Sequence, residues 1–358
     1  MKKGIVIILF VSGIFSAKAQ LAPKYSNEFL SIGVGARAAG MGDAVIASVN
    51  DATSGYWNPA ALMEIKDNIQ VALMHNELFA GISKEEYVGL SFKLNDKSVI
   101  GLSVIRNGVD DIPNTLNLMQ NGQIDYSLIS SFSAVDYGFI GSYARKMNIE
   151  GLSLGGNVKV IRRVIGDFAN AWGFGFDAGA KYNYGNWKFA ATVRDVTSTF
   201  NVWTYTFTDQ QKQILLATDN ALPSNNLELT LPKLTIAAAR KWAFFKDKFT
   251  VLAETDWDIN TDGQRNVLIH SSYFNIDPKL GFELGYANIV FLRGGMNNIQ
   301  QAKQIDGTTQ TSVVPTLGIG IKLNNLCLDY ALANVGSASG LLPYSNIISL
   351  RLSFNRKP

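Results

Sequence analysis

One short segment has the residue spacing of a cation-binding loop. Residues 258–263 read Asp-Ile-Asn-Thr-Asp-Gly, so Asp258, Asn260 and Asp262 could supply oxygen ligands as in the first half of an EF-hand calcium loop. The twelfth position of such a loop holds a bidentate glutamate, and here it is Ile269. We therefore expect a turn rich in Asx residues and no metal site, with calcium binding by this loop as the alternative.

Residues suited to catalysis do not form a recognised motif. The sequence contains no G-x-S-x-G and no H-E-x-x-H, and its two histidines are far apart. Acidic and basic residues do share one face of the predicted strands, and they favour structural ion pairs in a polar lumen over an acid–base pair. They are Glu254, Asp256, Glu283 and Arg293. We expect no enzyme activity and no cofactor.

A glycine-rich segment near the N-terminus is the most distinctive local pattern. Residues 29–44 do not spell the G-x-G-x-x-G turn of dinucleotide-binding proteins. Glycine here indicates a coil that must pass close to other backbone. The residues of interest are Gly33, Gly35, Arg37, Gly40 and Gly42, followed downstream by Asn58, Pro59 and Ala60.

A second candidate site is aromatic. Trp203, Tyr205 and Phe207 alternate within the long segment 195–232 and would lie on one face of an extended chain. Exposed aromatic side chains often anchor protein partners, so these three are candidate partner-binding residues. They could equally extend two strands above a membrane and pack within the chain.

The first residues indicate export. Met1-Lys2-Lys3, the apolar run from Ile5 to Phe15 and Ala17-Lys18-Ala19 have the order of a signal peptide, so we expect residues 1–19 to be removed. Removing three lysines from 32 basic residues leaves 29, against 29 acidic residues. This zero net charge gives no reason to expect nucleic acid as a partner.

The elements that position these residues are strands. Fourteen segments alternate apolar and polar residues with period two, and the links between them alternate long and short. The expected strands are 69–76, 85–94, 98–106, 136–146, 151–163, 172–183, 187–194, 233–242, 248–257, 278–286, 289–296, 315–323, 326–333 and 347–354. An even strand number with long and short links at opposite ends predicts an all-β, antiparallel transmembrane barrel over residues 68–358.

Residues 20–67 do not fit a spanning strand because of their glycines and the Asn58-Pro59 breaker. A fourteen-stranded barrel is wide enough to need filling. We therefore expect this segment to form a plug, or hatch, inside the lumen.

The segment from Phe29 to Asp43, together with Asp51 to Leu62, resembles the N-terminal signature of the PorV/PorQ family. That family is similar to the FadL fatty-acid transporters, whose hatch also carries an Asn-Pro-Ala stretch, matched here by Asn58, Pro59 and Ala60. Residues 288–295 also look like the family. The resemblance implies an outer-membrane barrel of Bacteroidetes linked to type IX secretion or gliding motility. It leaves open whether the chain is the central shuttle or an accessory paralogue.

Two functions follow as hypotheses. The main one is an outer-membrane barrel that binds the type IX translocon, secreted cargo or the attachment complex. The alternative is a FadL-like channel for hydrophobic small molecules, with residues 20–67 as a movable hatch. The inward faces carry many charged residues, such as Lys159, Asp177 and Glu254, and this polarity favours the protein-binding function over an apolar tunnel.

Overall fold

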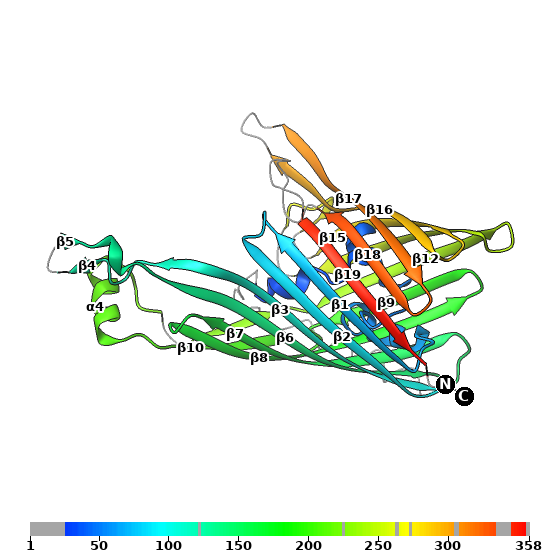
Figure 1. Cartoon of the computed structure of the whole chain (residues 1–358), viewed down its shortest axis with the longest axis horizontal. Helices are drawn as coiled ribbons and strands as arrows, with labels where there is room; N and C mark the ends of the chain where they lie inside the picture. The colour runs from blue at the N-terminus through cyan, green and yellow to red at the C-terminus, as the bar shows by residue number, and fades with distance from the viewer. Residues whose placement is uncertain are drawn as a thin grey trace.

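Fourteen antiparallel strands close into a barrel in the computed structural model (Figure 1). The structure describes residues 26–120, 123–223, 226–261, 265–271, 274–303, 308–333 and 345–355. The wall strands are β1 (Ile69–Leu78), β2 (Ser83–Asn95), β3 (Ser98–Asn114), β6 (Ser130–Lys146), β7 (Leu152–Ile165), β8 (Ala169–Tyr184), β9 (Trp187–Arg194), β12 (Lys233–Phe244), β13 (Phe249–Asn260), β15 (Asn275–Tyr286), β16 (Val290–Lys303), β17 (Thr309–Leu323), β18 (Leu326–Ala333) and β19 (Ser345–Phe354).

Closure comes from the pairing of the first and last strands, from Ile69 opposite Phe354 to Glu77 opposite Asn346. Every neighbouring pair is antiparallel, so the barrel has no free sheet edge along this seam. The predicted fold class, a fourteen-stranded antiparallel barrel, is confirmed. The predicted signal segment 1–19 lies outside the described residues.

Alternation along each strand separates an apolar outer face from a polar inner face. On β8, Trp172, Phe174 and Phe176 point outward, and Trp172 is 50% exposed. Lys181 on the opposite face of the same strand is only 1% exposed. An outer face of this composition suits contact with hydrocarbon, because the closed ladder leaves few backbone groups unpaired. No helix among the described residues is long and apolar enough to cross a membrane.

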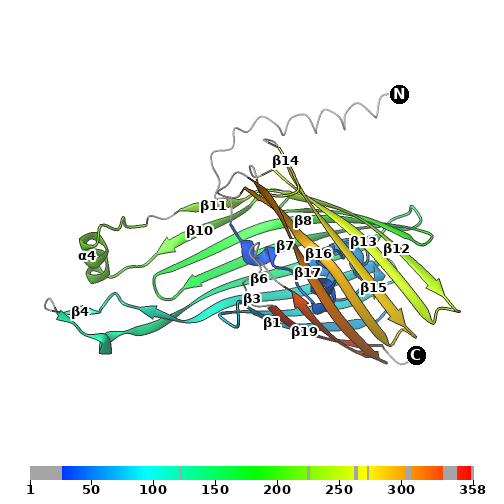
Figure 2. The ribbon, with the colours of Figure 1, turned by 90° about the horizontal axis from the view of Figure 1, so that it is seen from above.

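One side of the barrel continues well beyond the rest at the long-loop end (Figures 1 and 2). Strands β3, β6, β7 and β8 extend into this projection, together with β10 (Thr199–Tyr205) and β11 (Leu227–Thr230). The short strands β4 (Met119–Gln120) and β5 (Gln123–Ile124), the 3-10 turn η3 (Tyr126–Leu128) and α4 (Asp209–Ala217) lie at its far end. Strand β14 (Ile269–His270) pairs with β15 elsewhere on the rim.

Residues 26–65 lie inside the barrel, where the blue segments of Figure 2 are surrounded by strands. This N-terminal segment contains η1 (Glu28–Ser31), α2 (Ala36–Gly40), α3 (Ser54–Trp57) and η2 (Pro59–Glu64). Asn58 ends α3 and caps η2, because its side chain accepts a hydrogen bond from the Ala60 amide and Pro59 occupies the first turn.

Two neighbouring strands of the barrel wall are interrupted at the same height. Strand β9 ends at Arg194 and β10 begins at Thr199, while β11 ends at Thr230 and β12 begins at Lys233. Pairing between these two segments therefore stops at Arg194 opposite Lys233 and resumes at Thr199 opposite Thr230. Four residues on one side face two on the other, which is a large bulge in the wall.

Candidate functional site

A cavity of about 350 Å³ lies between the N-terminal segment and the half of the wall nearest the long loops. Its apolar lining includes Leu30, Ile140, Val314 and Ile347, and its polar lining is a group of charged side chains. A volume of this size is at the lower end of the range for small-molecule sites.

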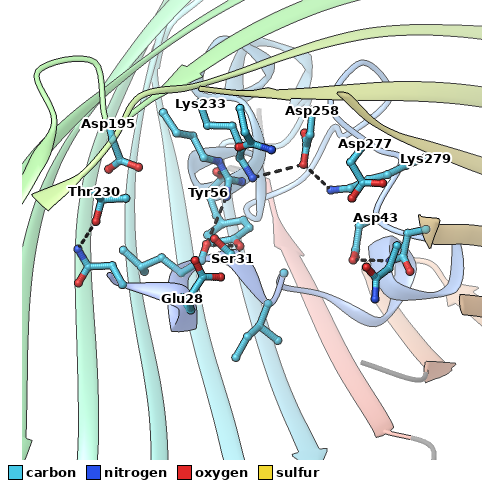
Figure 3. A pocket seen from close by; sticks show the side chains of 18 of the residues that line it. Glu28, Ser31, Asp43, Tyr56, Asp195, Thr230, Lys233, Asp258, Asp277 and Lys279 are labelled. Atoms are coloured by element: carbon cyan, nitrogen blue, oxygen red, sulfur yellow. Dashed lines mark hydrogen bonds and ion pairs between the residues drawn. The ribbon is translucent and has the colours of Figure 1, made fainter. Parts of the chain in front are cut away.

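The charged lining is organised around Asp258 on β13. Lys233 Nζ and Lys279 Nζ lie 3.3 and 3.1 Å from Asp258 Oδ2, and the Thr235 hydroxyl donates to Oδ1 at 2.6 Å. Figure 3 shows Asp43 and Asp277 beside the same group. Neighbouring inward positions on β12, β13 and β15 thus bring two lysines and two aspartates to one place, and Asp43 comes from the N-terminal segment.

Arg194 joins the N-terminal segment to the wall at the edge of the cavity. Its guanidinium lies 4.4 Å from the centre of the Tyr56 ring and donates to the carbonyl oxygens of Leu30 and Tyr56 at 3.3 and 3.2 Å. A cation over an aromatic face combined with two hydrogen bonds fixes this side chain firmly.

The cavity reaches the interrupted part of the wall. Its lining includes Arg194 and Asp195 from one interrupted strand, and Thr230, Leu231 and Pro232 from the other. Asp195 is held inward, because its amide donates to Asp177 and its carboxylate pairs with Lys159. Pro232 has no N–H to donate, so it cannot restore the ladder at this point.

Toward the short-turn end, the N-terminal segment fills the lumen and is bound by acidic wall residues. The amides of Val45 and Ile46 donate to Asp256 Oδ2 at 2.9 and 3.0 Å. The amides of Ala47 and Ser48 donate to Glu254 Oε1 at 2.6 and 3.2 Å. These two carboxylates therefore hold one turn of the segment against β13.

Ion pairs add further attachment. Arg37 Nε lies 2.9 Å from Glu283, which also pairs with Arg293, and Arg293 continues to Asp329 at 2.7 Å. The expected ion pairing of Glu283 and Arg293 is thus present, and Arg37 of the segment joins it.

Asp51 pairs with Arg351 of β19 at 2.7 Å and accepts hydrogen bonds from the Thr53 amide and hydroxyl. Burial alone would raise the pKa of Asp51, but the Arg351 guanidinium and the Thr53 hydrogen bonds hold that pKa below its usual value.

The glycines and the Asn-Pro-Ala stretch singled out in the sequence lie where backbones meet. Gly42 has a φ of 62°, and a Cβ there would be 2.6 Å from the Met296 amide nitrogen. Asn58 is fully buried and donates to the Ala180 carbonyl of β8. Opposite it, a Cβ on Gly179 would be 2.3 Å from Asn58 Oδ1, and a Cβ on Gly155 would be 2.5 Å from the Ala60 amide. These wall glycines were not identified from the sequence, although their place on the inward face of predicted strands was a usable signal.

The three candidate aromatic residues lie elsewhere, on the inner face of the projection. Trp203 is 5% exposed and stacks on Tyr205, which stacks on Phe207, with ring centres 6.2 and 6.4 Å apart. The Arg163 guanidinium covers Trp203 at 5.0 Å. The structure therefore places these rings in contact with their own chain, and little of Trp203 is open to a partner.

The calcium-loop residues do not converge on an ion position in the described part of the chain. Asp258 is engaged by the two lysines, Asn260 lines the cavity rim, and Asp262 lies outside the described residues. The described ranges contain no group of three His, Cys, Asp or Glu side chains placed to hold a metal ion. Lys233, Lys279 and Asp277 of the cavity were not identified from the sequence.

No family model and no curated protein matches this chain. Among solved structures, it is similar to the monoaromatic hydrocarbon channel CymD, with a TM-score of 0.58 and 13% identity over 91% of this chain and 98% of that one. The toluene transporter TodX of Pseudomonas putida gives 0.58 and 14%, over 90% and 98% of the two chains. The toluene transporter TbuX of Ralstonia pickettii gives 0.54 and 12%, over 90% and 99%.

At these identities the likeness establishes the fold. None of these neighbours supports the resemblance to PorV/PorQ or a link to type IX secretion, gliding motility or Bacteroidetes. The main prediction, a barrel that binds the translocon or secreted cargo, is contradicted, and the comparisons favour the small-molecule alternative. The error has a physical cause: inward charges such as Glu254 and Glu283 bind the N-terminal segment, so they do not line an open tunnel.

Proposed function

We propose that this chain is an outer-membrane channel that admits small hydrophobic organic molecules from the outside and releases them sideways into the membrane. The observation that carries the proposal is the position of the cavity: it meets the wall where the pairing of two adjacent strands is interrupted. The straight path toward the short-turn end is filled by the N-terminal segment. The shared fold with channels described as carrying toluene and monoaromatic hydrocarbons supports small, largely apolar organic molecules as cargo.

The orientation follows from the loops. Outer-membrane barrels place long loops outside and short turns in the periplasm, so the cavity would open toward the outside. Export would depend on the signal peptide expected at residues 1–19. Residues 20–67 would act as the hatch, with its glycines, Arg37 and the stretch Asn58-Pro59-Ala60 fitted against the wall.

The interrupted wall suits lateral release for a simple reason. Separating two regular strands breaks a row of backbone hydrogen bonds, each costly to lose in hydrocarbon. Between Arg194 and Thr199 that row is already absent on one side, and Pro232 removes a donor on the other. The outer side chains near this point, Phe174, Val196 and Phe200, are apolar and exposed, as contact with lipid requires.

A reversible disulfide between the two strands next to the interruption tests the proposal. Phe200 and Leu229 are registered partners directly above the interruption, so Phe200→Cys with Leu229→Cys should form a disulfide. We expect oxidation to lower the uptake of radiolabelled toluene or p-cresol by proteoliposomes to the level of protein-free liposomes, and a reducing agent to restore it. The matched control is Val158→Cys with Phe176→Cys, a registered outward pair in the uninterrupted part of the wall.

Normal uptake through the oxidised Phe200–Leu229 tether would show that the molecules do not leave by this route. If the untethered, correctly folded protein accelerates the entry of neither toluene nor p-cresol over protein-free liposomes, the channel itself is refuted.

A further inference from the structure

The cavity has a chemistry that a plain hydrocarbon does not match. Its apolar side chains face a group of charges that includes Lys233, Asp258 and Lys279 (Figure 3). Filling such a site with a molecule that has no polar group would remove water from these charges and supply nothing in return. A ligand with one polar end and an apolar body fits both parts of the lining.

Asp277 indicates which kind of polar end is required. It lies on the inward face of β15, directly opposite Asp258 on β13, and it lines the cavity. Its Oδ1 oxygen is buried and has no hydrogen-bond partner within the described ranges of the chain. A carboxylate oxygen can only accept, so its missing partner must be a donor.

The charges around Asp277 further narrow the class of polar head group that the ligand can carry. Three carboxylates, those of Asp43, Asp258 and Asp277, gather around Lys279, and both Lys279 and Lys233 are already bound to Asp258. An incoming carboxylate would meet acidic neighbours and two lysines that already share a partner. A neutral hydroxyl meets acceptors without repulsion.

We propose that the cavity selects molecules with an apolar body and a neutral hydrogen-bond-donating head, such as phenols and alkanols, and that Asp277 accepts the hydrogen bond of that head. This inference rests on the proposed channel function and narrows its cargo. It separates this chain from a channel whose cargo is a hydrocarbon such as toluene.

Three ligands with the same methyl-substituted ring test the head group alone: toluene, p-cresol and p-toluate. Binding is measured by equilibrium dialysis of labelled ligand with the detergent-purified full barrel, and uptake is measured in proteoliposomes. We expect p-cresol to bind about tenfold or more tightly than toluene, as one hydrogen bond to a charged acceptor allows, and p-toluate to bind more weakly than p-cresol at neutral pH.

Asp277→Ala should remove most of the p-cresol advantage and leave toluene binding unchanged. Asp277→Asn, which keeps the shape of the side chain, should give a smaller loss in the same direction if the alanine variant folds poorly. The control is Asp96→Ala, because Asp96 is an exposed turn residue at the opposite end of the barrel.

Equal binding of toluene and p-cresol by the unmodified protein would overturn this inference, as would an equal effect of Asp277→Ala on all three ligands. If the protein accelerates the entry of toluene and p-cresol equally over protein-free liposomes, the channel function stands and only the selectivity fails. If it accelerates the entry of none of the three ligands, both proposals fail.

Discussion

The ion pair between Arg351 and Asp51 gives a direct measure of how firmly the N-terminal segment is held. The two side chains are 19% and 9% exposed, and their charged atoms are 2.7 Å apart. Arg351→Met removes the cation and keeps an apolar stem, which leaves the Asp51 carboxylate inside the lumen with Thr53 as its remaining partner. Breaking a buried pair costs about 3–5 kcal/mol, and we expect about 3 kcal/mol because the pair is partly exposed and Thr53 stays bonded.

A loss of about 3 kcal/mol should raise the local opening of the segment roughly a hundredfold, since each 1.4 kcal/mol is a factor of ten. Native-state hydrogen exchange measures this opening at single amides, and the amides of Ala52 and Thr53 are the ones to follow. Arg351→Met with Asp51→Asn should recover more than half of the loss, because the unpaired charge is then absent. Unchanged exchange at these amides, or an equal acceleration throughout the barrel, would refute the reasoning.

The same ion pair makes the docking of the N-terminal segment depend on pH. The pKa of Asp51 is held below its usual value, so its ionised form stabilises the docked segment at every pH above about 4. This contribution is lost as the pH falls through the lowered value in the folded protein. Exchange in the unmodified protein should therefore accelerate only in strong acid, and in Asp51→Asn it should show no such step.

Further substitutions probe separate parts of the structure. Gly42→Ala should cost about 2 kcal/mol or more, because alanine disfavours the positive φ and its Cβ would meet Met296; urea unfolding followed by gel shift measures this. Val158→Arg should cost about 2–4 kcal/mol, because this exposed outward residue lies at the middle of β7, and a neutral effect in refolding titrations into bilayers would contradict the outward assignment. Asn157→Arg should also destabilise, since Asn157 is buried and donates to the Gly55 carbonyl at 2.8 Å; a lumen open at this position would tolerate it. Trp203→Ala should make the 195–232 region sensitive to limited proteolysis and leave the barrel itself folded, because Trp203 packs with Ile165, Ala169, Ala171 and Tyr205 at the ends of β7, β8 and β10.

The wall of the barrel could be predicted from the sequence because two signals repeat along the whole chain. Period-two alternation marks each strand, and the regular change between long and short links fixes both the number of strands and the side on which loops lie. The projection was interpreted as loops, although β3 continues to Asn114 and β10 runs from Thr199 to Tyr205. Alternation continues into these residues, but the predicted strands were ended at about the length needed to cross a membrane, which was too early.

The cavity could be predicted only in part. The inward position of Lys233, Asp258 and Lys279 can be read from each strand separately, but their meeting depends on the register between strands, and β14 and a long link separate β13 from β15 in sequence. The four-against-two bulge at 195–198 gives no local signal, because it appears only when the partner strand is known. The place of Asp43 in the cavity depends on the path of the N-terminal segment, which residue spacing does not determine.

The measurement that tests the channel most directly is the uptake of labelled p-cresol and toluene by proteoliposomes that contain the full barrel, with sucrose as a hydrophilic control. The structure predicts faster entry of p-cresol than in protein-free liposomes, no acceleration of sucrose because the N-terminal segment fills the lumen, and loss of the acceleration when the Phe200→Cys and Leu229→Cys tether is oxidised. Entry of sucrose together with the aromatic molecules would mean an open pore, and equal entry of all three in the presence and absence of the protein would contradict a channel of this kind.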